Sequence, residues 1–167
     1  MPTGYIILCV VVVIVFIGIR IYQKSTRDKL SSEGKIIERD KDFQRQATIF
    51  TTRASFNDFL PVLQAYALEN DHIRWKTDPP NHLINFSCQS VAQDTSFRAF
   101  LKCTKSINEI YEYRFEFNYF RAQKSITTSK QQPIANVLQT TVEKIFYQLD
   151  NATTIRREAV HYQATRG

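Results

Sequence analysis

The longest apolar stretch of the chain lies at its N-terminus. Residues 4–19 read GYIILCVVVVIVFIGI and contain no charged side chain. A helix rises about 1.5 Å per residue, so residues 1–19 would cover roughly 28 Å, close to the ~30 Å hydrocarbon core of a bilayer. The run is apolar around the whole helix, which only lipid or a large protein core tolerates. The pattern predicts a transmembrane anchor within residues 1–22 that contacts the lipid bilayer through residues 4–19.

A cleavable signal peptide is an alternative for this run, and a soluble core helix is another. The n-region MPTG has no basic residue, and no small-residue cleavage site follows the run, which disfavours cleavage. Basic residues follow the run and none precedes it. Since Lys and Arg accumulate on the cytoplasmic side of membrane spans, we expect the N-terminus outside and the C-terminal domain in the cytoplasm. The flanking basic residues are Arg20, Lys24, Arg27 and Lys29.

Beyond the apolar run, charged residues of both signs alternate. Residues 23–45 mix acidic and basic side chains with serine and glycine, which predicts a solvated juxtamembrane linker. The chain is 43% hydrophobic and 13% aromatic, enough for one hydrophobic core. We expect one soluble domain over residues 46–160, followed by a loose tail at residues 161–167.

The domain is predicted to open with a strand and a helix. The β-branched segment QATIFTT predicts a strand at residues 46–52. Apolar residues then recur at helical spacing from Phe56 to about Glu69. Proline is tolerated only in the first turn of a helix, so the position of Pro61 favours Asn57 or Asp58 over Ser55 as the N-cap.

Two strands are predicted on either side of a proline-containing turn. Residues 72–77 and 82–89 flank Asp78-Pro79-Pro80-Asn81, where two prolines prevent ladder pairing and favour a hairpin turn. If Thr77 opposes His82, the apolar residues of both strands share one face.

A second hairpin shows the clearest alternation. Residues 96–105 and 110–121 alternate apolar and polar positions, with a turn expected at residues 106–108. Two registers keep the apolar faces together. We predict the one that places Leu101 opposite Tyr113 and Lys102 opposite Glu112, because the other sets Lys102 against an arginine, and like charges directly opposite each other are destabilising.

The last element is predicted to be a long amphipathic helix. Pro133 suits the first turn of a helix, and the helix is expected to end near Ala152. One apolar stripe follows from the 3.6-residue period: Ile134, Val137, Leu138, Thr141, Val142, Ile145, Phe146 and Leu149. The opposite face, expected to be solvated, carries Gln139, Glu143, Lys144 and Gln148. The predicted fold is therefore α+β: after the transmembrane helix, a domain of order β-α-β-β-β-β-α, with a mostly antiparallel five-stranded sheet and two helices on one face.

Composition and charge narrow the function. The net charge is +6, but residues 20–46 hold 8 basic and 5 acidic residues, residues 47–130 hold 10 and 8, and the remainder 4 and 3. This even spread disfavours nucleic acid as a partner. All 4 glycines lie outside the domain, which excludes phosphate-binding loops, dinucleotide fingerprints and nucleophile elbows. The 3 cysteines and 3 histidines have no metal-ligand spacing, so no metal or cofactor is expected.

Two sets of aromatic residues are candidate sites. One could line a cavity for an apolar ligand beneath the helices, although filling the core is the simpler role. Its members are Trp75, Phe86, Phe97, Tyr111, Tyr113, Phe115, Phe117 and Tyr119. Phe100 and Phe120 are candidates for an exposed partner surface.

No residue pattern specifies a reaction. Acidic side chains lie where turns and caps need them, so we identify no catalytic residue and expect a non-enzymatic chain. The leading hypothesis is a single-pass membrane-tethered binding or adaptor module with a protein partner. The alternative is a carrier or sensor of a hydrophobic ligand held between the aromatic sheet face and the helices.

Overall fold

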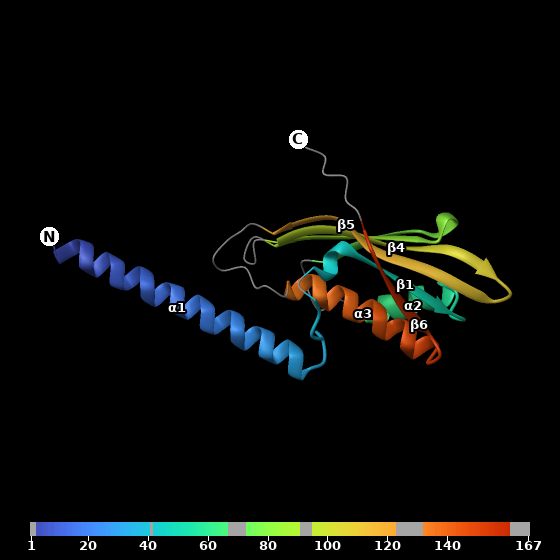
Figure 1. The fold of residues 1–167 in the computed structure, drawn as a ribbon, viewed down its shortest axis with the longest axis horizontal. Coiled ribbons are helices and arrows are strands. Elements are labelled where there is room, and N and C mark those ends of the chain that lie inside the picture. Colours follow the sequence, from blue (N-terminus) through green and yellow to red (C-terminus); the bar gives the residue numbers. More distant parts are fainter. Residues whose placement is uncertain (1–2, 41, 67–72, 91–94, 123–131, 161–167) are drawn as a thin grey trace. The chain divides into compact units, whose positions relative to one another are not determined.

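The fold was analysed in a computed structural model, which describes residues 3–40, 42–66, 73–90, 95–122 and 132–160. The chain divides into two compact units, residues 1–37 and residues 38–167. The first contains the N-terminal helix and the second is the α+β domain. Figure 1 shows both units.

The first unit is one long helix, α1 (Thr3–Ser32). It is the one described helix long and apolar enough to cross a membrane, and the apolar side chains from Leu8 to Ile21 are exposed. It ends where Gly34 adopts a positive φ of 63°, with Lys35 N donating to Leu30 O and Gly34 N donating to Ser31 O. These two bonds form a Schellman motif, the usual termination of a helix by glycine.

The helix is longer than the predicted anchor. It has 30 residues, whereas about 20 suffice for a membrane span, so its last turns contain residues 23–32 of the predicted linker. The other end of that linker belongs to the domain, because Phe43 is buried in the core. The chain between these two ordered parts is therefore much shorter than the sequence indicates.

The second unit is an α+β domain with one antiparallel six-stranded sheet in the order β2-β3-β4-β5-β1-β6. The predicted fold class and antiparallel sheet are confirmed, but the strand count is six, not five. The strands are β1 (Gln46–Thr52), β2 (Ile73–Asp78), β3 (Leu83–Ser90), β4 (Thr95–Ile107), β5 (Ile110–Ala122) and β6 (Thr154–Ala159). The helices are α2 (Phe56–Ala65) and α3 (Pro133–Leu149), with short 3-10 turns η1 (Phe43–Arg45) and η2 (Pro79–Asn81).

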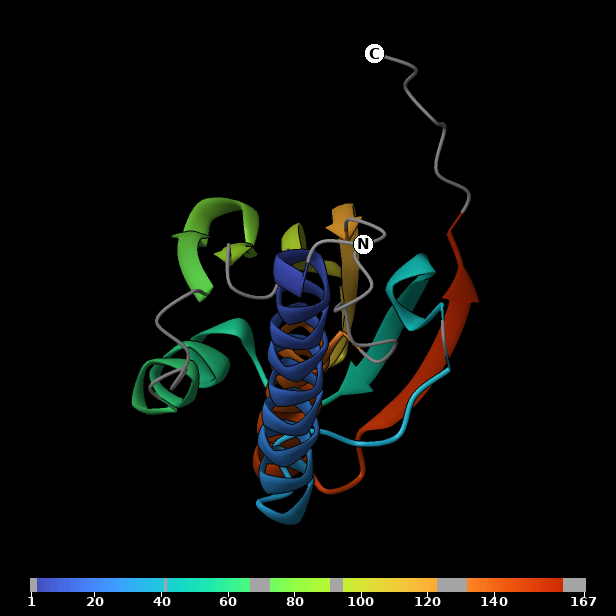
Figure 2. The same cartoon turned by 90° about the vertical axis from the view of Figure 1, so that its left-hand side faces the viewer.

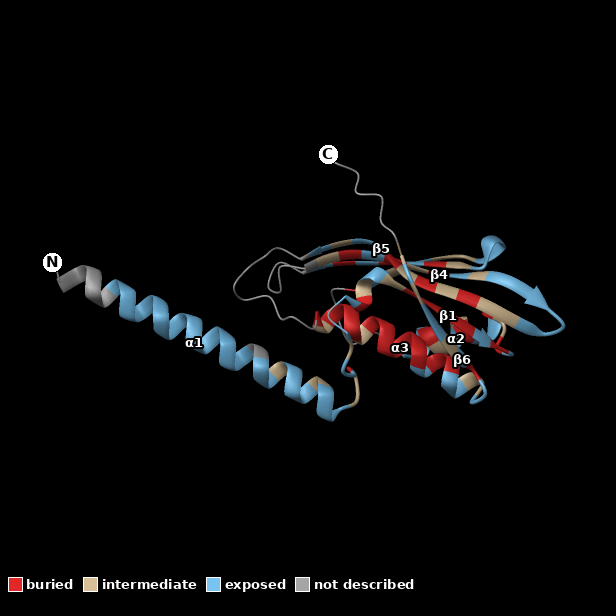
Figure 3. Cartoon of the chain, in the orientation of Figure 1, coloured by how far each residue is buried: buried red, intermediate tan, exposed pale blue. Residues whose placement is uncertain are grey.

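Helices α2 and α3 lie on the same face of the sheet, which we call the inner face (Figure 1). The core forms between them, where Phe146 stacks on Phe50 with ring centroids 4.5 Å apart and lies 4.7 Å from Phe59. The buried Tyr113 hydroxyl donates to Ala54 O over 3.1 Å, so the largest inward side chain of β5 also has a polar partner. Buried residues continue along most of α3 (Figure 3).

Helix α2 begins earlier than predicted. Ser55 is the N-cap, and a capping box joins its hydroxyl to Asp58 N and the Asp58 carboxylate to Ser55 N, so the prediction of Asn57 or Asp58 as the cap is wrong. Pro61 therefore lies beyond the first turn. The cap and the buried Phe56, Phe59 and Leu63 offset the missing backbone donor. The predicted end near Glu69 lies outside the described residues.

The hairpin of β2 and β3 forms around η2, as the two prolines predict. Thr77 opposes Ile84, two residues from the predicted partner His82. His82 adopts a positive φ of 46° and ends the 3-10 turn, so it leaves the ladder. A slip of two residues keeps the apolar faces together, since side chains alternate with a period of two.

The predicted register of β4 and β5 is wrong, because Lys102 opposes Arg114 and Leu101 opposes Phe115. The connection is a two-residue turn at Asn108 and Glu109, both with positive φ, in place of the predicted three-residue turn. A bulge between Cys103 and Lys105 follows. The bulge places Lys105 opposite Glu112, with Lys105 Nζ 3.8 Å from Glu112 Oε1, and Arg114 binds Glu116 at 2.7 Å. The Glu116 carboxylate thus offsets the charge of Arg114, while Lys102 still lies opposite Arg114.

A second bulge changes the faces of β5. Arg98 opposes Tyr119 while Ala99 opposes Phe117, so Asn118 is the extra residue. Beyond this point Tyr119 is exposed and Phe120 packs on the core, 6.2 Å from Phe117 between ring centroids. A bulge inverts the alternation of all later residues in a strand.

The sixth strand was missed in the sequence. Strand β6 pairs antiparallel with β1 at one edge of the sheet, and Figure 2 shows the two side by side. It is possible because α3 ends at Leu149, three residues before the predicted Ala152. There Asp150 accepts hydrogen bonds from Arg53 N and Ala152 N at 2.8 and 3.0 Å. The predicted tail at residues 161–167 lies outside the described residues.

Candidate functional site

The outer face of the sheet carries a basic pocket over β3. Strand register places Ser87 between Arg74 on β2 and Arg98 on β4, and the next row places Asn85 opposite Lys76. Short polar side chains on the central strand thus lie between long cationic ones on its neighbours. Because adjacent strands are about 4.8 Å apart, the cationic rows are separated by about 10 Å, which leaves a groove.

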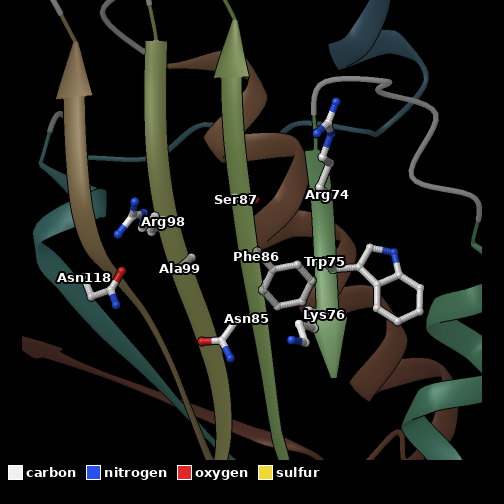
Figure 4. Close-up of a pocket in the computed structure, with 9 residues that line it drawn as sticks. All are labelled: Arg74, Trp75, Lys76, Asn85, Phe86, Ser87, Arg98, Ala99 and Asn118. Atoms are coloured by element: carbon white, nitrogen blue, oxygen red, sulfur yellow. The ribbon is translucent and has the colours of Figure 1, made fainter. Parts of the chain in front are cut away.

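The groove forms an open pocket of about 400 Å³. Four strands contribute, and Figure 4 shows Arg98 and Asn118 on one side of Ser87 with Arg74 and Lys76 on the other. Side chains of all these polar residues are exposed. The lining residues are Arg74, Trp75, Lys76, Asn85, Phe86, Ser87, Arg98, Ala99 and Asn118.

The charge of this surface is positive. The pocket lining contains three cations and no carboxylate. Lys102 and Arg121 are exposed on the outer face of β4 and β5 and enlarge the surface. We call Arg74, Lys76, Arg98, Lys102 and Arg121 the basic face. Among the described residues, none of these five has an ion pair within 4.0 Å, whereas the acidic Glu112 and Glu116 on β5 pair with other cations.

Such a surface binds anions by attraction and by hydrogen bonds. Guanidinium groups present several donors that match carboxylate and phosphate oxygens, and the Ser87 and Asn85 side chains add neutral donors. The described lining of the pocket contains three cations and no carboxylate or histidine. No group of three metal-ligating side chains occurs in the described part of the chain.

The aromatic residues proposed to line a cavity lie mostly in the core. Phe86, Phe97, Tyr113, Phe115 and Phe117 are buried on the inner face. Neighbouring rings contact each other, for example Phe97 and Phe117 with centroids 5.3 Å apart. Trp75 and Tyr111 pack against this cluster from its margin, and Tyr119 lies outside it. The packing favours a role in the core for the buried rings.

The two phenylalanines proposed as a partner surface are separated by the Asn118 bulge. Phe100 is half-buried on the outer face, opposite Asn85 on β3 and Glu116 on β5, and so borders the basic pocket. Phe120 faces inward and stacks near Phe97 with centroids 6.4 Å apart. Only Phe100 of this pair lies on the candidate binding surface.

A second charged cluster is buried and joins the start of the domain to α3. The Arg39 side chain is 3% exposed and forms two bonds with the Glu143 carboxylate at 3.0 and 2.8 Å. It also donates to Asn136 Oδ1 and Thr140 Oγ1, each at 3.0 Å. Gln139 Nε2 donates to Glu143 Oε1 at 3.2 Å. The prediction that Gln139 and Glu143 lie on a solvated face is therefore wrong.

This buried cluster connects the segment before β1 to α3. Among the described residues, the hydrogen bonds of the Arg39 side chain all go to α3, so Arg39 fixes the segment before β1 to that helix. A depression of about 280 Å³ beside it carries both charge signs, from Glu38, Asp40, Arg39 and Arg157. Satisfied ion pairs of this kind are typical of structural contacts. The side-chain amide oxygen of Gln139, Oε1, is buried with no hydrogen-bond partner among the described residues.

The thiols of the domain are poorly suited to chemistry. Burial raises the pKa of Cys88 to about 11. Burial also raises the pKa of Cys103, against the hydrogen bond that its sulfur makes with Lys105 O. Since the thiolate is the reactive form, neither side chain is an activated nucleophile.

Comparisons with known proteins add no functional assignment. No family model matches the chain, and no curated protein matches it. The candidate site therefore rests on geometry and charge alone.

The basic face was missed in the sequence, although part of its signal was present. Alternation places Arg74 with Lys76 on one face of a strand, and Arg98 with Lys102 on one face of another. The sequence alone does not show which strands pair with each other. Summing the charge over residues 47–130 hides the face, because the sum also counts Glu112 and Glu116, which pair with other cations.

Proposed function

We propose that this chain is a single-pass membrane protein whose domain is a non-enzymatic binding module for an anionic partner. The observation that carries the proposal is the basic pocket, where Arg74, Lys76 and Arg98 surround Ser87 and no carboxylate takes part in the lining. Helix α1 supports the membrane attachment, since it is long and apolar enough to cross a membrane and its apolar side chains from Leu8 to Ile21 are exposed. The basic residues after the apolar run support a cytoplasmic domain.

Membrane attachment is tested by alkaline carbonate extraction of the expressed full chain. We expect it to stay with the membranes, and the same chain lacking residues 4–19 to be released. Protease added to sealed cells should leave the domain intact. Digestion from outside would contradict the orientation, and carbonate release of the full chain would contradict the anchor.

Anion binding is tested on the full chain in dodecyl maltoside micelles. The probe is a fluorescein-labelled deca-glutamate peptide, followed by fluorescence anisotropy. We expect saturable binding that weakens as salt rises, because the cations are exposed and an ionic strength of 0.15 M limits their reach to about 8 Å. Arg74→Gln/Lys76→Gln/Arg98→Gln should abolish it.

A matched variant controls for net charge. Arg45, Arg53 and Lys105 are exposed cations outside the pocket, and their replacement by glutamine changes the charge by the same amount. Arg45→Gln/Arg53→Gln/Lys105→Gln should bind the peptide as the unmodified chain does. Equal losses in both variants, or no saturable binding by the unmodified chain, would contradict a site at the basic pocket.

A further inference from the structure

We propose that the anionic partner of the basic face is the phospholipid surface of the bilayer that holds α1. The inference rests on the proposed function, since it names the ligand of the same pocket. The lipid headgroups would be bound by the domain of the same molecule that is anchored among them. Three features support this ligand: the short connection between α1 and the domain, the basic residues on both, and the open shape of the pocket.

The connection between anchor and domain is short. Helix α1 ends at Ser32, and Lys35 N and Ile36 N still bond to Leu30 O, so the chain stays with the end of the helix to that point. At Arg39 the chain is already hydrogen-bonded to Glu143 of α3. Between Ser32 and Arg39 the chain spans at most about 25 Å even when fully extended. A short tether keeps a weakly binding surface at millimolar effective concentration.

The charges on the two units have the same sign. The basic face contributes five cations, and the residues that follow the apolar run include Arg20, Lys24, Arg27 and Lys29. Anionic lipids are concentrated in the cytoplasmic leaflet, which is the side expected for the domain. A soluble acidic ligand must be brought to the domain, whereas anionic headgroups are always within its reach.

The pocket has the shape expected for headgroups. It is an open groove with exposed cations and a floor of small polar side chains, Ser87 and Asn85, not a closed cavity for one molecule. Phe100 borders it as a half-buried aromatic side chain. Aromatic groups beside cations are common where a protein surface meets the interfacial layer of a bilayer.

Lysine footprinting of the full chain in nanodiscs tests this inference. The protein is placed in discs of phosphatidylcholine alone or in discs with roughly one-third phosphatidylserine, and acetylation by a water-soluble reagent is followed by mass spectrometry. We expect Lys76 and Lys102 to react about threefold more slowly or less in the anionic discs, because headgroups cover them. Lys144, exposed on α3, is the internal reference and should react equally in both.

Two variants complete the test. In Arg74→Gln/Lys76→Gln/Arg98→Gln, the protection of Lys102 by phosphatidylserine should disappear. In Arg45→Gln/Arg53→Gln/Lys105→Gln, the protection of Lys76 and Lys102 should persist. Protection that is equal in neutral and anionic discs, or that includes Lys144 to the same degree, would overturn headgroup binding by this face.

The outcome separates the two proposals. If deca-glutamate binds to the basic pocket but phosphatidylserine protects neither lysine, the domain is an anion-binding module with a soluble acidic partner, and the lipid inference is wrong. If neither probe acts on the basic face, both proposals are wrong. Protection of Lys76 by added RNA and not by phosphatidylserine would likewise reject lipid as the ligand.

Discussion

The domain holds arginine in two contrasting environments. Arg39 is buried, and Glu143, Asn136 and Thr140 accept its hydrogen bonds. Arg98 is exposed on the outer face, and no described carboxylate lies within 4.0 Å of it. The same side chain is satisfied by the fold in the first environment and left available to another molecule in the second.

The difference shows which charges can serve function. A buried guanidinium without partners would destabilise the fold. Side chains on one face of α3 therefore accept the hydrogen bonds of Arg39. An exposed guanidinium is already solvated by water and needs no internal acceptor. We propose the outer face as the binding surface because its charges are not used by the fold.

Removing the buried cation should have the largest effect. Arg39→Ala leaves the buried Glu143 with Arg157, at 3.7 Å, as its remaining cation. The loss of the closer ion pair should lower the free energy of unfolding by about 3 kcal/mol. Urea denaturation of the full chain in detergent, followed by fluorescence of the single tryptophan Trp75, measures this loss. Arg39→Met/Glu143→Leu removes both charges and should recover most of it. If Arg39→Ala lowers the free energy of unfolding by less than ~1 kcal/mol, the contact between Arg39 and Glu143 does not stabilise the fold.

Burial should also suppress thiol reactivity. The pKa of Cys88 is raised from 9.0 to about 11, so the thiolate fraction at neutral pH is about 100-fold lower than for an exposed thiol. We expect iodoacetamide to modify Cys88 only in urea, and Cys103, which is half-buried, to react sooner. Mass spectrometry after timed alkylation measures both rates. Rapid modification of Cys88 in the folded protein would contradict its burial.

Acid should weaken the connection between α3 and β6. Hydrogen bonds from Arg53 N and Ala152 N lower the pKa of Asp150, which contributes stability above its unfolded pKa of about 4. That contribution is lost as the pH falls through the lower folded pKa. Asp150→Asn should be less stable at neutral pH and lose less stability on acidification. Thermal unfolding at several pH values measures this, and a pH profile identical to that of the unmodified chain would contradict the cap.

Neutralising the basic face should have the smallest effect on stability. Exposed substitutions of this kind change the free energy of unfolding by about 0.5 kcal/mol or less each. Arg74→Gln/Lys76→Gln/Arg98→Gln should therefore unfold at nearly the same urea concentration as the unmodified chain, while anion binding is lost. A large loss of stability would mean that these cations belong to the fold, and the contrast with Arg39 would fail.

The sequence was sufficient for elements whose pattern is local. Strand β1, the proline turn and the start of α3 at Pro133 follow from residue types at fixed spacing. The α+β class and the antiparallel sheet follow from the order of those elements.

Registers and buried polar contacts depend on residues far apart in the chain. In the sequence, Glu143 occupies a position typical of a solvated helix face. In the fold it binds Arg39, which lies 104 residues away in the chain. Strand β6 contains Arg156, Arg157 and Glu158, and this charged run obscures its alternation. The basic face needs β2, β3 and β4 to be aligned before its cations form one surface.

The extra residue Asn118 has a consequence for how this domain can vary. Before Asn118 the odd-numbered residues of β5 face the core, whereas after it the even-numbered Phe120 does. If β5 paired without this bulge, the same residues would turn Phe120 toward water and Arg121 toward the core. Deleting Asn118 would instead join Phe117 to Tyr119 in regular alternation and keep Phe120 facing inward. A substitution along β5 leaves this alternation in place, whereas one residue inserted after Asn118 would exchange the faces of every later side chain in the strand.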